Sequence, residues 1–385
     1  MFITKHHYAV ELSRLNNRVF FLNPPQSDSW SWNKAKKRIR VTQSDVYPNL
    51  FLVDHELFFP YLLKYHCRWL YDILIKKHLF EIEQQLGEKI DLVWSFDHLN
   101  ICPLEYFKNA FRIFHPVDDS TCPHSFRAAK TADILFTVTK EIVRKYNHYR
   151  VPKYLISHGV AEAFFEPAPL PVREQSQQLQ VGLSGNWLRP DLDHSTLIRI
   201  IRENAGVRFH FFGSYAMSDT NLGGGHHAHN EFISTLQNFG NVKLHGAIVY
   251  TQLAAWLHQM DAFLICYDVN KDQSNGTNYH KIMEYLSTGK VIVSNNVSSY
   301  NNLPGIIQMV VERDHNNELP GLFKKVIANL AFHNSVQLSE KRKAYARNNT
   351  YQMQIKRIEQ ILYPSAKTEK LVVESPFSPN ALAVQ

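Results

Sequence analysis

The sequence predicts an α/β protein with two domains, each built on a parallel sheet. Its 385 residues exceed what one typical hydrophobic core holds, which suggests about two domains. Short apolar runs alternate with segments of helical periodicity, and strands that are apolar throughout are typical of parallel sheets covered on both faces. A stretch rich in Pro and Gln at residues 166–178 divides the chain near its middle and suits a linker.

The first half begins with an amphipathic helix at residues 6–16. Its predicted strands are the apolar runs at 19–22, 50–53, 92–96, 111–114 and 134–138. Helical patterns separate these runs, so we expect a first α/β domain over residues 1–168, followed by a linker at 169–178.

The second half repeats the same rhythm. Its predicted strands lie at 179–183, 207–212, 242–244, 262–266 and 291–293, and its predicted helices at 195–204, 230–238, 251–260, 322–331, 338–346 and 353–362. We therefore expect a second domain over 179–348 and a final helix within 349–363. The tail at 364–385 lacks apolar periodicity and is predicted to be disordered.

Charge and cysteine usage restrict the partners and the location. Lys and Arg number 42 against 35 Asp and Glu, a net charge of +7, which favours an anionic partner. Nucleic acid is the least favoured, because there is no dense Lys/Arg stripe and no known nucleic-acid module.

No apolar run reaches the roughly 18 residues of a spanning helix, so we expect a cytoplasmic protein, soluble or peripheral on a membrane. The four cysteines lack C-x-x-C spacing and support neither a zinc site nor a disulfide framework.

The most informative motif is a turn followed by a helical segment at residues 278–288. The turn consists of four small residues, Ser274, Asn275, Gly276 and Thr277. Unpaired backbone N–H groups and the positive end of a helix dipole suit a phosphate at such a turn. Lys281 and Glu284 share one face of the helix, where the ammonium would meet a diphosphate and the carboxylate would meet ribose hydroxyls. The alternative is a solvated Lys281–Glu284 ion pair on a surface helix, which contributes little.

Residues 281–293 carry a family resemblance. They read Lys-Ile-Met-Glu-Tyr-Leu-Ser-Thr-Gly-Lys-Val-Ile-Val, which resembles the donor-binding signature of the GT-B glycosyltransferases, Pro-Lys-x-x-Glu-Tyr-x-Ala-x-Gly-Lys-Pro-Val-Val. This chain has His280 and Val291 in place of the two prolines, and Gly276 where retaining members often have a first Glu. The resemblance covers residues 6–363 and is more specific in the second half.

The resemblance implies a GT-B architecture. Two Rossmann-like domains would face a cleft that closes over the sugar, with the acceptor in the first domain and a nucleotide-sugar donor in the second. The C-terminal helix at 349–363 would cross back to the first domain. The family's first strand has no counterpart before His6, so we expect it to be missing or degenerate.

The loop after the strand at 179–183 is the second candidate donor contact, because residues 181–187 resemble the first strand and loop of the family's nucleotide-binding domain. Gly185 would let the backbone approach a phosphate, Asn186 would lie beside it, and Arg189 would neutralise the departing diphosphate. The alternative is a plain strand-to-helix turn. We interpret Asp191 and Asp193 as helix-terminal charges and caps rather than as a metal site, and the Gly- and His-rich residues 223–229 as a loop.

Two first-domain residues follow the strand at 111–114. Ligands of open α/β sheets bind beyond the carboxyl ends of strands. His115 is similar to the histidine that GT-B members place beside the donor sugar, and Asp118 or Asp119 would orient an acceptor hydroxyl. The alternative is a structural turn. Residues 157–165 resemble a segment that ends the family's first domain and serve mainly as a fold marker.

A basic, aromatic helix is expected within residues 60–85. Its cations are Lys64, Arg68, Lys76 and Lys77, and its apolar residues recur at helical spacing. The favoured interpretation is a helix docked on its own sheet. The alternative is a helix that lies on an anionic membrane leaflet.

Taken together, these features predict a metal-independent glycosyltransferase of the hexosyltransferase kind that needs no cofactor. It would move a sugar from a nucleotide-sugar to a glycan or lipid-linked acceptor with retention of configuration, in surface polysaccharide or glycoconjugate biosynthesis. The alternatives are a GT-B-fold epimerase or phosphorylase, and a non-catalytic protein that binds nucleotide-sugars.

Overall fold

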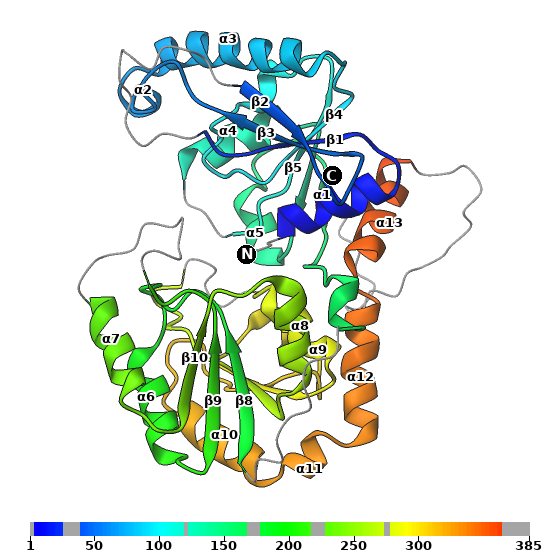
Figure 1. Cartoon of the computed structure of the whole chain (residues 1–385). Coiled ribbons are helices and arrows are strands. Elements are labelled where there is room, and N and C mark those ends of the chain that lie inside the picture. The colour runs from blue at the N-terminus through cyan, green and yellow to red at the C-terminus, as the bar shows by residue number, and fades with distance from the viewer. Residues whose placement is uncertain are drawn as a thin grey trace. The chain divides into compact units, whose positions relative to one another are not determined.

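The chain divides into two compact units. The computed structural model describes residues 4–25, 39–118, 122–167, 178–216, 228–272 and 278–363. The first unit holds Ile3–Ile156, and the second holds the residues from Ser157 onward (Figure 1). Most of the expected linker and the whole expected tail lie outside the described residues.

The first unit begins with a small mixed sheet. Helix α1 (Thr4–Arg14) precedes β1 (Val19–Leu22), β2 (Ile39–Gln43) and β3 (Leu50–His55). The order is β1-β3-β2, with β1 parallel and β2 antiparallel to β3. The antiparallel β2 is absent from the sequence prediction, because its residues Ile-Arg-Val-Thr-Gln are half-buried or exposed and give only a short alternating pattern.

A second sheet of the first unit is parallel throughout. Its elements, in chain order, are α2 (Leu63–His66), α3 (Arg68–Leu86), β4 (Leu92–Ser95), β5 (Phe111–Phe114), α4 (Pro123–Thr131), β6 (Ile134–Thr137), α5 (Lys140–Lys145) and β7 (Lys153–Leu155). The order is β4-β5-β6-β7. Phe114, Leu135 and Ile142 form part of its buried core. A separate core joins Val53 of β3 to Tyr71 and Ile75 of α3.

The second unit contains a six-stranded parallel sheet. Its strands are β8 (Leu179–Ser184), β9 (Val207–Phe212), β10 (Val242–Gly246), β11 (Ala262–Ile265), β12 (Val291–Ser294) and β13 (Gln308–Met309). The order is β10-β9-β8-β11-β12-β13, with parallel pairs throughout. This is the doubly wound order of nucleotide-binding sheets, and its topological switch point lies between β8 and β11.

Helices cover both faces of this sheet. The helices of the second unit are α6 (His194–Glu203), α7 (Ala228–Gln237), α8 (Tyr250–His258), α9 (Lys281–Ser287), α10 (Leu319–Ala328), α11 (Leu330–His333), α12 (Val336–Arg347) and α13 (Tyr351–Leu362). Helix α6 packs against α10, and α9 packs against α12 on the opposite side (Figure 1). The described residues also form 3-10 helices at Leu104–Tyr106, Glu162–Phe164 and Ser298–Tyr300. Each described helix is too short or too polar to span a lipid bilayer.

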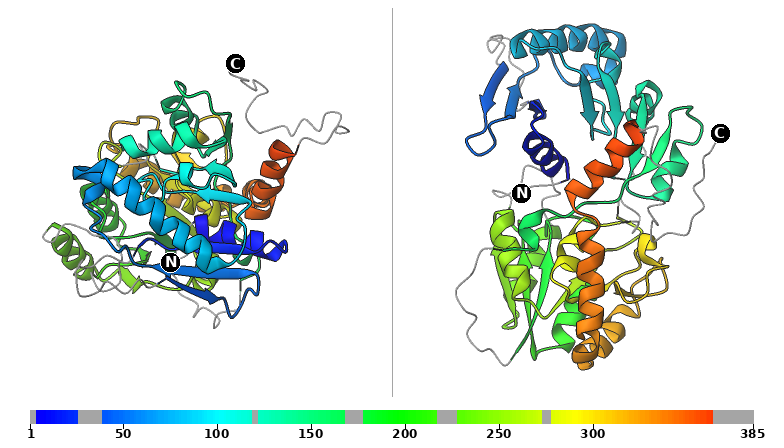
Figure 2. Two further views of the ribbon diagram at one scale, coloured as in Figure 1. Left: turned by 90° about the horizontal axis from the view of Figure 1, so that it is seen from above. Right: turned by 90° about the vertical axis from the view of Figure 1, so that its right-hand side faces the viewer.

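The segment that opens the second unit is bonded to the start of its last helix. The Val160 N–H donates to the Asn349 carbonyl at 3.0 Å, and the Tyr351 N–H donates to the Val160 carbonyl at 3.2 Å. A Cβ on Gly159 would come within 2.6 Å of the Tyr351 ring, so glycine is required for this approach. Helices α12 and α13 follow one another with a short break between them (Figure 2). The crossing of α13 to the first domain stays a prediction.

Candidate functional site

The backbone at the carboxyl ends of β8, β9 and β10 is tightly packed. The Gly185 N–H donates to the Phe212 carbonyl at 2.9 Å, and the Gly213 N–H donates to the Gly246 carbonyl at 2.8 Å. Gly213 has φ +123°, and a Cβ there would lie 1.8 Å from the Gly185 carbonyl oxygen. These contacts hold the loop after β8, which carries several predicted donor contacts, against the neighbouring loop.

Lys281 lies at the topological switch point. Its Nζ donates to the Ser184 carbonyl at the end of β8 and to the Tyr267 hydroxyl, just beyond β11, the latter at 2.7 Å. The same Nζ is 4.9 Å from the centre of the Tyr267 ring. Lys281 is buried, so the alternative of a solvated ion pair on a surface helix is wrong. The ammonium instead joins the two strands between which doubly wound sheets bind ligands.

Tyr267 belongs to a polar network that is absent from the residues predicted from the sequence. Its ring stacks on Tyr279 with the centroids 4.7 Å apart, and the Tyr279 hydroxyl donates to Asp272 at 2.7 Å. The Asn295 amide donates to the same hydroxyl at 3.3 Å, and its oxygen accepts from the Tyr267 N–H at 3.0 Å. Burial raises the pKa of Tyr279 well above its ordinary value, so this hydroxyl stays protonated. A signal was available, because Tyr267 and Asn295 closely follow the ends of β11 and β12.

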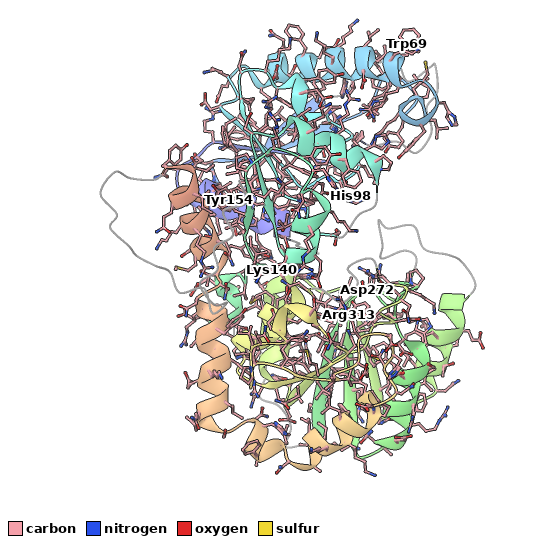
Figure 3. All side chains as sticks on the ribbon, turned by 180° about the vertical axis from the view of Figure 1, so that it is seen from behind. Trp69, His98, Lys140, Tyr154, Asp272 and Arg313 are labelled. Atoms are coloured by element: carbon pink, nitrogen blue, oxygen red, sulfur yellow. The ribbon has the colours of Figure 1, made fainter. Side chains whose placement is uncertain are left out.

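Arg189 borders this network, with its guanidinium 5.7 Å from the centre of the Tyr267 ring. Its guanidinium binds both carboxylate oxygens of Asp191, with Nε to Oδ1 at 2.8 Å, and one nitrogen lies 3.9 Å from Asp272. The hydrogen bond to Asp191 raises the pKa of Arg189. Its charge therefore has a carboxylate partner within the protein, and its role toward a departing diphosphate stays a prediction. Figure 3 shows Asp272 beyond the strand ends of the second unit.

The neighbouring acid has the predicted structural role. The Asp193 carboxylate accepts from the Thr196 N–H at 3.0 Å and caps α6, which confirms the cap interpretation for Asp193, whereas Asp191 binds Arg189 instead. Asn186 also serves its own loop, because its side-chain oxygen accepts from the Leu188 N–H at 3.0 Å. A contact from Asn186 to a donor stays a prediction.

Glu284 differs from these residues in its bonding. It lies three residues after Lys281 on α9 and is half-buried. Within the described residues its carboxylate makes no hydrogen bond and no ion pair, and burial raises its pKa to about 7, against the opposing effect of Lys281. A carboxylate that is desolvated without a hydrogen-bond donor is destabilised in its charged form. Perturbed groups of this kind gather at functional sites.

The turn before α9 is only partly described. Helix α9 begins at Lys281 rather than at residue 278, and residues 278–280 form an irregular segment that ends in a turn. The predicted phosphate-binding residues Ser274, Asn275, Gly276 and Thr277 lie outside the described residues.

The two predicted first-domain residues belong to the other unit. His115 follows β5 and is completely buried. Its Nδ1 accepts from the Trp94 indole at 3.3 Å, and its ring stacks on Phe96 with the centroids 5.0 Å apart. Asp118 is exposed. The surroundings of His115 are those of a packed aromatic residue, and the catalytic roles of both residues stay predictions.

Comparison with known proteins places the fold. No known family model matches the sequence, and no curated protein matches it. Solved structures do match. The sucrose-phosphate synthase of Thermosynechococcus elongatus has a TM-score of 0.67 at 11% identity, over 94% of this chain and 92% of that one. The α,α-trehalose 6-phosphate synthase of Burkholderia multivorans has a TM-score of 0.58 at 12% identity, over 90% of both chains.

A third matching structure is a complex with bound ligands. HepE of Anabaena, in complex with UDP and glucose, has a TM-score of 0.57 at 12% identity, over 82% of this chain and 86% of that one. At these identities the likeness concerns the fold. Together with the parallel sheets of both units, it shows that the chain has the GT-B fold, as the sequence predicts.

Proposed function

We propose that the protein is a glycosyltransferase that takes its sugar from a nucleoside-diphosphate sugar. The observation that carries this proposal is the Glu284 carboxylate, which lacks a hydrogen-bond donor among the described residues and lies one turn from Lys281 at the switch point. The two hydroxyls of a ribose would donate to it and would stabilise its charged form. The GT-B fold supports the proposal, because its second domain is the donor domain.

Lys281 is the proposed electrostatic partner of the diphosphate. An ammonium has three N–H donors, and two of them are used by the Ser184 carbonyl and the Tyr267 hydroxyl. The third remains for a phosphate oxygen. Because the two protein acceptors fix the position of Nζ, the charge is preorganised for the negative charge that builds up as the diphosphate leaves. Lys281 with Arg189 would perform this role without a metal ion.

The acceptor and the pathway form the finer part of the proposal. A glycan or a lipid-linked sugar would accept the hexose with retention of configuration, as the resemblance at residues 281–293 implies. The product would be a surface polysaccharide or another glycoconjugate, assembled in the cytoplasm or on the inner face of the membrane. Uridine is the first nucleotide to test, because the HepE structure that matches this fold holds UDP.

The decisive experiment is a thermal-shift panel of UDP-, ADP- and GDP-sugars on the parent protein and on Glu284→Gln. A ligand at about 100 times its Kd adds about 2.7 kcal/mol of stability, and we expect Glu284→Gln to lose that gain. Glu359→Gln, an exposed position on α13, serves as the matched control. If no nucleotide-sugar stabilises the parent, the proposal is wrong.

Product analysis then separates the enzyme classes. A transferase gives a glycosylated product only when an acceptor is added, whereas an epimerase converts the nucleotide-sugar alone. Binding without turnover in the presence of acceptors would identify a nucleotide-sugar-binding protein instead.

A further inference from the structure

Helix α3 is apolar on two opposite faces. Its inner face, with Tyr71, Ile75 and Leu79, is buried in the core against β3, which confirms the prediction of a helix docked on its own sheet. Its outer face carries Trp69, Ile73 and Phe80, whose side chains are 67%, 58% and 58% exposed. Figure 3 shows Trp69 on the outside of the first unit.

The exposed residues form one stripe. Positions 69, 73 and 80 are separated by four and seven residues, which places them along one side of an α-helix. Leu62 and Tyr65 are also exposed, and they lie at the α2 end of the same helical region. Single exposed apolar residues are ordinary on protein surfaces. An aligned series that includes a Trp and a Phe is instead typical of a surface that contacts something else.

The charge on this face is positive. Lys76 and Lys77 are exposed between Ile73 and Phe80, whereas the acids of α3, Asp72, Glu81 and Glu83, are half-buried. Asp72 is also held by Arg68 at 3.0 Å and by Arg127 at 3.1 Å. The exposed charges of α3 are therefore its two lysines, within the apolar stripe.

We propose that the outer face of α3 binds the surface of a bilayer that contains anionic lipids. Trp69, Ile73 and Phe80 would enter the boundary between headgroups and acyl chains, while Lys76 and Lys77 would meet the anionic headgroups. A protein partner is a poorer match, because lysine is depleted at the centres of protein–protein interfaces. The flexible stem of a lysine, in contrast, lies along an apolar surface while its charge reaches the headgroups.

The structure changes which cations take part. Of the four cations that the sequence suggested for membrane contact, Lys64 is 2% exposed and bonded to the Leu99 carbonyl. Arg68 is bonded to Asp72 and to His124. Lys76 and Lys77 remain as the outward pair. The inference rests on the proposed function, because a lipid-linked acceptor is what would bring the enzyme to a membrane. Vesicle binding can nevertheless be measured without a donor and without turnover.

The test is sedimentation of the full chain with vesicles of phosphatidylcholine alone or mixed with phosphatidylglycerol. We expect the protein to bind the mixed vesicles, and we expect this binding to weaken as salt is added. The reason is that the Debye screening length falls from about 8 Å at 0.15 M salt to about 3 Å at 1 M. Each lysine near such a surface contributes about 1 kcal/mol, so Lys76→Gln with Lys77→Gln should lower the partition coefficient by about 30-fold. Trp69→Ser with Phe80→Ser should also lower it strongly.

Matched controls come from the second unit. Lys324 and Lys325 are adjacent exposed lysines on α10, and Phe332 is an exposed aromatic residue on α11. Lys324→Gln with Lys325→Gln, and Phe332→Ser, should leave vesicle binding unchanged. Melting curves show whether each variant is folded, and the lysine pair tests the proposal even if the Trp69 and Phe80 changes impair folding.

Three results would overturn the inference. One is binding that is equal for the two vesicle types, and another is binding that falls equally in the α3 and control variants. The third is a dimer of the parent protein, seen by light scattering, that becomes a monomer in Trp69→Ser. The stripe would then be an interface between two copies of the chain. If the parent protein binds nucleotide-sugars but not vesicles, only the membrane inference is contradicted. If it binds vesicles but no nucleotide-sugar, only the proposed function is contradicted.

Discussion

The Lys281 ammonium lies so close to Gly185 that a Cβ at position 185 would come within 2.9 Å of Nζ. The sequence predicts Gly185 as a residue that lets the backbone approach a phosphate. The structure adds that the missing side chain also leaves room for the ammonium at the end of β8.

Gly185→Ala should therefore displace the ammonium while costing little stability, because the end of a flexible lysine side chain can move. We expect a melting temperature close to the parent's and a rate constant for sugar transfer that is at least tenfold lower, measured by single-turnover kinetics. The change should have little further effect in a Lys281→Ala background, because the two residues act through one contact. Gly206→Ala, where a Cβ meets nothing within 4 Å, is the control. Additive losses in the double variant would contradict the prediction.

Glu284→Ala and Lys281→Ala should damage activity in different ways. Glu284 would hold ribose in the ground state and the transition state alike, so its loss should weaken binding of the free nucleoside diphosphate and the donor together. Lys281 acts mainly as charge builds up on the leaving group, so its loss should lower the rate constant, by about 100- to 1000-fold. Calorimetry and single-turnover kinetics measure the two effects separately. Two variants that behave like the parent would remove α9 from the site.

The pKa of Glu284, raised from its ordinary value of 4.5 to about 7 by burial, predicts a pH-dependent stability. Between these pH values the unfolded chain loses the proton that the folded protein keeps, so the carboxyl's contribution to stability falls as the pH rises and is fully lost above pH 7. Glu284→Gln should thus stabilise the free protein by about 2 kcal/mol above pH 7, allowing for partial solvent contact, and by almost nothing below pH 4.5. Denaturant unfolding at several pH values measures this. A stabilisation that is the same at every pH would contradict the assignment.

Gly213→Ala should destabilise the second unit. The residue has φ +123°, and its Cβ would collide with the Gly185 carbonyl at 1.8 Å, so both the backbone and a neighbouring loop would have to move. We expect a loss of about 3 kcal/mol or more, seen in denaturant unfolding. Gly240→Ala, where a Cβ has open space, is the control and should be close to neutral. A stable Gly213→Ala would show that the two loops separate easily.

His115→Phe tests the proposed catalytic role without emptying the aromatic cluster around the ring. If His115 acts on the sugar, turnover should fall by at least tenfold while nucleotide binding and stability stay near the parent values. His115→Ala would confuse this result, because removing a buried ring also leaves a cavity. An unchanged rate in His115→Phe would assign the residue to packing alone.

The fold could be predicted largely because its central strands are continuously apolar. Strands β8, β9, β11 and β12 are almost entirely buried, and such runs indicate parallel sheets directly. The missed strands β2, β7 and β13 are short and lie at sheet edges, where half-exposed residues give a weak pattern. The order of the strands within each sheet depends on pairing between distant segments, and local hydrophobic periodicity does not predict that pairing.

The candidate site was predictable only where one segment carried it. Lys281 and Glu284 lie three residues apart and could be recognised together. Tyr267 and Asp272 lie in the connection between β11 and α9, whereas Asn295 follows β12, and hydrogen bonds to Tyr279 and to the Tyr267 N–H bring them together. The ends of β11 and β12 place Tyr267 and Asn295 at one edge of the sheet, but the sequence does not show which side chains bond there, so the partners of Lys281 could be identified only in the folded chain.

The pairing of Val160 with Asn349 and Tyr351 means that the start of the second unit lies against the connection between its last two helices, α12 and α13. These two hydrogen bonds therefore fix where the last helix begins relative to the segment that precedes β8. Gly159 makes this contact possible, because a Cβ at this position would collide with the Tyr351 ring. Replacing Gly159 should loosen this junction before it disturbs the six-stranded sheet.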